Sequence, residues 1–136
     1  MSAMNGLTVD RQLAAPPDRV WEALTDPDRL ARWFWPARFE TSAALEAREG
    51  GALRIASAPV GIGVTGTVTA VDPGHLLATT WRWDGEDLET RVTIALTADS
   101  AGTRVTVRHE GFADGEAAAD HVQGWNDCLD RLRDAL

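Results

Sequence analysis

A long run of short alternating segments, followed by a single helical stripe, constrains the fold of this chain most strongly. Between residues 39 and 111, apolar and polar residues alternate in segments that turn residues separate. Leu77, Thr79 and Trp81, for example, share one face of a predicted strand. The short connections between these strands favour an antiparallel sheet. The last segment changes to spacings of three and four, which predicts one long helix with apolar positions at Ala118, Val122, Trp125, Leu129, Leu132 and Leu136.

The start of the chain adds one strand and two short helices. Residues 7–13 alternate as in a half-buried strand, with Arg11 as an exception on the apolar side. Pro16 and Pro17 end this strand and begin a helix, and Asp26 is the predicted cap of a second helix. We therefore expect an α+β fold in which a curved antiparallel sheet of about seven strands wraps around the long C-terminal helix. In this arrangement the two short helices close one end of an apolar chamber between sheet and helix.

The tryptophans indicate where this chamber lies. The chain has six tryptophans, three phenylalanines and no tyrosine. Because the tryptophans are spread over elements far apart in sequence, they can meet only around one common core or chamber. The rings expected either to line the chamber or to fill it are Trp81, Trp83 and Trp125. The residues predicted at its mouth are Trp35 and Phe112, and those predicted to pack the short helices against the sheet are Trp21, Trp33 and Phe34.

Composition excludes several classes of function. The 136 residues carry a net charge of −8, with thirteen arginines and no lysine, which is typical of a GC-rich bacterial genome. An acidic chain without a basic stripe is a poor candidate for binding nucleic acids or anionic membranes. Cys128 is the only cysteine, so no internal disulfide is expected. Residues 1–6 show no signal-peptide pattern, and no segment approaches the ~20 apolar residues of a membrane helix. We expect one cytoplasmic domain over residues 1–136.

Short motifs in a specific order resemble one known family. They are the segment from Ala15 to Pro27 with Leu30 and Trp33, Arg48-Glu49-Gly50-Gly51, Gly66-Thr67-Val68, Thr80-Trp81-Arg82-Trp83, Gly102-Thr103-Arg104-Val105, His109-Glu110-Gly111-Phe112 and Gly124-Trp125. Together they resemble the family named for the activator of the ninety-kilodalton heat-shock protein's ATPase, within the SRPBCC superfamily (START-like, helix-grip). The resemblance covers about residues 7–136. It implies the helix-grip fold with a deep internal cavity, in a superfamily that includes lipid carriers, hormone receptors and polyketide cyclases.

His109 and Arg11 are the polar candidates for the chamber. His109 shares the inward phase of its strand with Val105 and Val107, so it is a candidate ligand donor or acid–base group, or else a hydrogen-bonded core histidine. Arg11 would anchor a carboxylate or phosphate of a ligand, or pair with an acidic neighbour such as Glu110. No residue is assigned as catalytic, because no second group lies on a matching face.

The sequence predicts neither a metal site nor a cofactor. His75, His109 and His121 are interpreted as isolated from one another, and His121 is expected at the rim of the last helix. The glycines at residues 61–66 are not followed by the Gly-Lys-Ser/Thr of a phosphate-binding loop.

Three hypotheses about function follow. The first is the binding or carriage of an apolar small molecule, aromatic or lipid-like, in the chamber. The second is an enzyme of the cyclase, aromatase or hydrolase type that uses the same chamber. The third is a co-chaperone-like module that binds a partner protein. For the third, the resemblance implies a separate N-terminal domain with which the eukaryotic co-chaperone docks on its chaperone, and we do not expect such a domain within these 136 residues.

Overall fold

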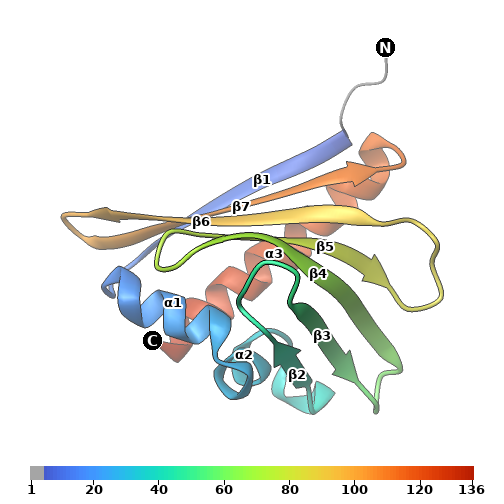
Figure 1. The fold of residues 1–136 in the computed structure, drawn as a ribbon, viewed down its shortest axis with the longest axis horizontal. Helices are drawn as coiled ribbons and strands as arrows, with labels where there is room; N and C mark the ends of the chain where they lie inside the picture. Colours follow the sequence, from blue (N-terminus) through green and yellow to red (C-terminus); the bar gives the residue numbers. More distant parts are fainter. Residues whose placement is uncertain (1–4) are drawn as a thin grey trace.

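The computed structural model describes residues 5–136, which form one seven-stranded antiparallel sheet, three α-helices and a short 3-10 helix (Figure 1). The strands are β1 (Asn5–Leu13), β2 (Ser42–Leu45), β3 (Ala52–Ser57), β4 (Ile62–Asp72), β5 (Leu76–Trp83), β6 (Thr90–Asp99) and β7 (Gly102–Phe112). The helices are α1 (Pro17–Thr25), α2 (Pro27–Trp33), η1 (Ala37–Phe39) and α3 (Gly115–Ala135). The predicted α+β helix-grip fold is confirmed. Residues 1–4 of the predicted domain, with most of the segment expected to lack a signal peptide, lie outside the described residues.

The topology wraps the sheet around α3. The strand order is β1-β7-β6-β5-β4-β3-β2, so the first and last strands are neighbours and β2 forms the opposite edge. Helix α3 lies against β1 and β7, while α1 and α2 pack near its C-terminal end (Figure 1). No helix within residues 5–136 has both the length and the apolar character needed to span a membrane.

The two short helices form as the proline and capping signals predict. Helix α1 has a proline in its first turn, and the Asp26 carboxylate accepts a hydrogen bond from the Asp28 N–H at the start of α2. The Trp33 indole Nε1 donates to the Ala23 carbonyl over 2.8 Å, which fixes α2 against α1. Trp33 therefore packs the short helices, as predicted.

Two strand boundaries differ from the predicted ones. The strand expected over residues 43–48 ends at Leu45, because the chain then makes a tight turn in which Arg48 N–H donates to Glu46 O and Gly51 N–H to Arg48 O. The loop expected over residues 59–63 ends earlier, since β4 already begins at Ile62. After Leu45, hydrogen bonds of the turn end the strand although the residue types favour its continuation. At Ile62 and Gly63, pairing with β3 extends the strand into residues whose types favour a loop.

The pairing of β4 with β5 contains a bulge and a close backbone approach near the aromatic end of β5. The pairing register shifts between Val68 and Ala70, and such shifts bend a sheet locally. Nearby, Gly66 passes so close to β5 that a Cβ atom there would lie 2.0 Å from the Thr80 carbonyl oxygen. The close approach is next to Trp81, and Trp81 and Trp83 lie at the C-terminal end of β5.

Candidate functional site

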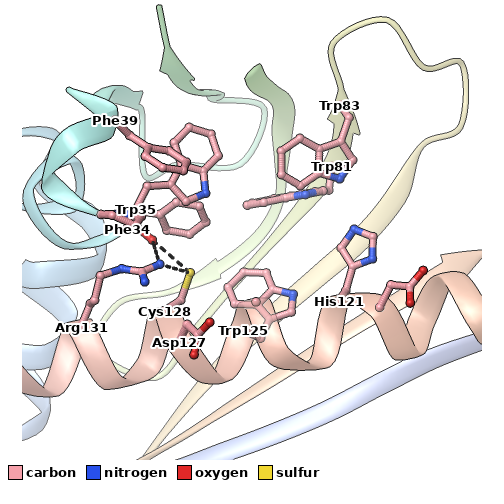
Figure 2. Close-up of a pocket in the computed structure, with 13 residues that line it drawn as sticks. Phe34, Trp35, Phe39, Trp81, Trp83, His121, Trp125, Asp127, Cys128 and Arg131 are labelled. Atoms are coloured by element: carbon pink, nitrogen blue, oxygen red, sulfur yellow. Dashed lines mark hydrogen bonds between the residues drawn. The ribbon is translucent and has the colours of Figure 1, made fainter. Parts of the chain in front are cut away.

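An aromatic pocket lies between β5, the α2–η1 segment and the middle of α3, and has a volume of about 300 Å³ (Figure 2). A volume of this size is at the lower end of the roughly 300–1,000 Å³ typical of small-molecule sites. Its lining consists of Phe34, Trp35, Pro36, Phe39, Trp81, Trp83, Asp120, His121, Gly124, Trp125, Asp127, Cys128 and Arg131. We call Trp35, Trp81, Trp83 and Trp125 the pocket tryptophans.

The aromatic rings form a continuous wall. Trp35 and Trp83 stack with an interplanar angle of 18° and centroids 6.3 Å apart. Phe34 contacts both Trp81 and Trp125, with centroids 5.9 Å apart in each pair. Because Trp35 comes from the α2–η1 connection, Trp83 from β5 and Trp125 from α3, the wall exists only when all three parts are folded together.

Trp81 and Trp125 touch each other rather than face each other across a space. Their ring centroids are 5.5 Å apart. Behind them lies a second, apolar void of about 30 Å³, which these two rings and Phe34 also line. Such a volume holds about one water molecule. The sequence left open whether Trp81, Trp83 and Trp125 line the chamber or fill it. The structure combines both alternatives, because Trp81 and Trp125 pack against each other in its centre and all three rings line a pocket on one side.

His109 is the centre of a buried hydrogen-bond chain. Its side chain is 0% exposed, and Trp125 Nε1–H donates to His109 Nδ1 over 3.0 Å. An indole N–H only donates, so Nδ1 is the acceptor and Nε2 carries the proton. Nε2–H then donates to Thr90 Oγ1 over 2.6 Å, and the Thr90 hydroxyl donates to the Trp81 carbonyl over 3.1 Å. The chain thereby connects β7, α3, β6 and β5.

The hydrogen bonds around His109, together with its burial, hold the imidazole in its neutral form. Burial, with a smaller effect from the neighbouring His121, lowers the pKa of His109 from 6.5 to about 3. Both ring nitrogens are engaged, and His109 is not among the pocket-lining residues. The geometry therefore favours the hydrogen-bonded core histidine over the acid–base group.

The expectation that the histidines are isolated from one another is wrong for His109 and His121, and His121, which was expected at the rim of the last helix, lies in the pocket lining. Their ring centroids are 5.6 Å apart, and His121 lines the pocket. His121 Nδ1 lies 2.8 Å from the Ala117 carbonyl, which only accepts, so Nδ1 carries the proton. In the neutral ring, Nε2 is then an acceptor. A signal for this position existed, because His121 precedes Trp125 by one helical turn and shares its face.

Arg131 and Cys128 form the opposite end of the pocket (Figure 2). Arg131 Nε donates to the Trp33 carbonyl over 3.0 Å, and its Nη2 donates to the Phe34 carbonyl over 2.7 Å. The guanidinium thus satisfies carbonyl groups at the C-terminal end of α2, where positive charge is favourable. The Cys128 thiol donates to the same Phe34 carbonyl over 3.1 Å, and burial raises its pKa to about 11.

The other predicted residues have different positions. Trp35 and Trp83 line the pocket, and Trp35 is buried. Phe34 packs against Trp33, as predicted for the short helices, but it also lines the pocket, which was not predicted. Arg11 lies outside the pocket, where its guanidinium pairs with Asp130 and donates to Asn126 on α3; Glu110, the neighbour suggested from sequence, is not its partner. Phe112 is buried against His109 and His121, behind the pocket lining.

Two further observations concern polar groups. The buried Trp81 Nε1–H has no hydrogen-bond partner within residues 5–136, although Trp81 lines the pocket. Asp120 and Asp127 lie on the α3 side of the pocket, Asp120 exposed and Asp127 half-buried. In the part of the chain that the structure describes, no three His, Cys, Asp or Glu residues come together as metal ligands.

Known structures share this architecture. Protein MLL2253 from Mesorhizobium loti is 27% identical, with a TM-score of 0.83 over 96% of this chain and 95% of that chain. Protein CV1439 from Chromobacterium violaceum is 28% identical, with a TM-score of 0.81 over 96% of each chain. DynU16, from the dynemicin biosynthetic locus, is 29% identical, with a TM-score of 0.84 over 96% of this chain but 46% of its own length. No curated protein matches the sequence significantly.

The comparison with family models gives the assignment that the motifs suggested. The model for Activator of Hsp90 ATPase homolog 1-like proteins matches residues 14–136, which begins at the end of β1 and includes every pocket-lining residue. The protein therefore belongs to the family of Activator of Hsp90 ATPase homolog 1-like proteins.

Proposed function

We propose that this protein binds an apolar aromatic small molecule in the pocket beside α3. The observation that carries the proposal is the wall of pocket tryptophans and phenylalanines around a space of about 300 Å³. Large apolar surfaces that remain accessible within a concave site favour an apolar ligand, because its binding removes both surfaces from water. Tryptophan faces additionally favour flat aromatic partners in offset or edge-on contacts.

The same geometry favours binding over catalysis by His109. A general base needs a free nitrogen within reach of the substrate, and both nitrogens of His109 are engaged behind the pocket wall. Family membership does not by itself transfer chaperone binding to this chain, because one fold supports many functions. The origin of DynU16 in a biosynthetic locus is consistent with small-molecule chemistry among similar structures.

A fluorescent apolar probe tests the proposal. N-phenylnaphthylamine is neutral, and its emission rises when it leaves water for an apolar site. Titration into the native protein is expected to give a saturable rise with a stoichiometry of about one, as for a single concave site. A linear, non-saturating rise, or no rise at all, contradicts the proposal.

Gly124 offers a variant that fills the pocket without disturbing the core. It lines the pocket from α3, and a Cβ atom built there meets no atom within 4 Å. Gly124→Leu should therefore occupy ligand space, while the helix gains about 0.5–1 kcal/mol from the loss of a glycine. The matched control is Gly115→Leu, at the start of the same helix and outside this pocket, where a Cβ also has open space. We expect Gly124→Leu to abolish saturable binding and Gly115→Leu to retain it.

A further inference from the structure

We propose that the ligand is a hydroxyl-bearing aromatic compound whose hydroxyl group bonds His121 Nε2 and Trp81 Nε1. This inference rests on the proposed function and specifies its ligand. The pocket is mainly aromatic, so the few polar atoms that line it decide the orientation and chemical class of what binds there. Two polar atoms of lining residues are distinctive: His121 Nε2 is an acceptor, and Trp81 Nε1–H is a donor that lies beneath the pocket surface.

His121 supplies the acceptor. Its Nδ1–H is bonded to the Ala117 carbonyl one turn earlier on α3, which fixes both the tautomer and the ring orientation. Contacts with Phe112 at 4.7 Å and with Trp83 at 6.2 Å between centroids hold the ring on two further sides. Figure 2 shows the imidazole projecting from α3 toward Trp81 and Trp83. An acceptor held in this way selects ligands that present an O–H or N–H.

Trp81 supplies the donor. The residue is 5% exposed, and its Nε1–H is buried without a partner among the described residues. Two other buried tryptophans differ in this respect, because the Trp125 indole N–H donates to His109 Nδ1 and the Trp33 indole N–H donates to the Ala23 carbonyl. A buried N–H without an acceptor is unfavourable. In the free protein this N–H lies beneath the pocket surface, so the proposal requires the indole ring to turn toward the pocket when the ligand binds. The ligand oxygen then supplies the hydrogen bond that the described residues do not.

The positions of the two residues suit a single polar group at the edge of a flat ligand. Trp81 and His121 both pack against His109, with centroid distances of 5.8 Å and 5.6 Å, and both pack against Trp83. A hydroxyl is the smallest group that both donates and accepts. The part of the wall formed by Trp35, Pro36 and Phe39 is apolar and takes the body of the ligand.

Three probes of similar shape separate the two contacts. Naphthalene has no polar group, methoxynaphthalene has an oxygen that only accepts, and naphthol both donates and accepts. Each is measured by displacement of N-phenylnaphthylamine in the same buffer. Because the probes differ in hydrophobicity, the informative quantity is the change in an affinity ratio between wild type and variant.

The variants are His121→Leu and Trp81→Phe, with His75→Leu as an exposed control outside the pocket. His121→Leu is expected to lower the naphthol-to-methoxynaphthalene ratio by roughly three- to tenfold, the range for one hydrogen bond. Trp81→Phe is expected to lower the methoxynaphthalene-to-naphthalene ratio by a similar factor, while the His75 variant leaves both ratios unchanged.

The outcomes distinguish this inference from the proposed function. If N-phenylnaphthylamine does not bind, the proposed function fails, and this inference fails with it. If the probe binds but His121→Leu and Trp81→Phe leave both ratios as in wild type, an apolar site exists and the hydroxyl assignment is overturned. If only one ratio changes, the single-hydroxyl contact is likewise overturned.

Discussion

The buried His109 should make this protein unusually sensitive to mild acid. In the unfolded chain, His109 takes up a proton near its ordinary pKa of 6.5, whereas in the folded protein burial lowers that pKa to about 3. Between these values the unfolded state binds the extra proton. The free energy of unfolding therefore falls as the pH decreases through this window and recovers as the pH rises.

The size of this effect follows from the difference between the two pKa values. Lowering the pH from about 7.5 to about 5 should cost about 2 kcal/mol of unfolding free energy through His109 alone. For a domain of this length, such a loss corresponds to a decrease of roughly 5–8 °C in Tm. The measurement is urea-induced unfolding followed by tryptophan fluorescence, at constant ionic strength and several pH values.

His109→Gln is the variant that isolates this contribution. A glutamine amide can also accept from Trp125 Nε1–H and donate to Thr90 Oγ1, but it does not titrate. The variant should lose about 2 kcal/mol less than wild type over the same pH interval. His75→Gln, at an exposed position, should keep the wild-type dependence. If wild type and His109→Gln have the same dependence on pH, the reasoning about the neutral, hydrogen-bonded His109 is refuted.

Three further predictions concern packing and reactivity. The Cys128 thiol, with its pKa raised to about 11, should not react with a disulfide reagent near pH 8 in the folded protein and should react fully in urea; rapid labelling of the folded protein would contradict its burial. Gly66→Ala should reduce the free energy of unfolding by at least about 2 kcal/mol, because the new Cβ meets the Thr80 carbonyl oxygen at 2.0 Å; an unchanged urea midpoint would disprove the close approach. Arg131→Met should reduce the free energy of unfolding by about 1–2 kcal/mol, because it removes the hydrogen bonds to the C-terminal end of α2. Backbone hydrogen exchange should then become faster in α2 more than in β7. A uniform increase in exchange across the protein would contradict a local stabilisation of α2 by Arg131.

Much of the fold was predictable because local signals and global packing agree. The Asp26 cap and the flanking prolines define the two short helices, and the alternation in β5 assigns one face to Leu77, Thr79 and Trp81, which are all buried. The early end of β2 was not predictable in the same way. It depends on a turn within residues 46–51, whose hydrogen bonds to the backbone of β4 join segments apart in sequence.

The candidate site was predictable in its residue types but not in its arrangement. The strand phase of Trp81 and Trp83 and the helical face of Trp125 indicated that these rings would meet. The phase alone does not say whether two rings touch or leave a space, since that depends on sheet curvature. The placement of His121 was missed, although its spacing from Trp125 was available, because a partly polar helix face does not reveal which strand covers it. The partners of Arg11 were missed for the same reason: they lie on α3, far along the chain.

The central claim, that the pocket binds an aromatic small molecule, is tested most directly by the indole N–H signals in a nitrogen–proton NMR spectrum. The six tryptophans should give six such signals, one for each ring. Addition of naphthol should shift the signals of the pocket tryptophans, with the largest change at Trp81, whose N–H has no partner among residues 5–136. The signals of Trp21 and Trp33, which are not among the pocket-lining residues, should stay in place. Shifts confined to Trp21 and Trp33, or no shift at any indole at saturating naphthol, would contradict the account.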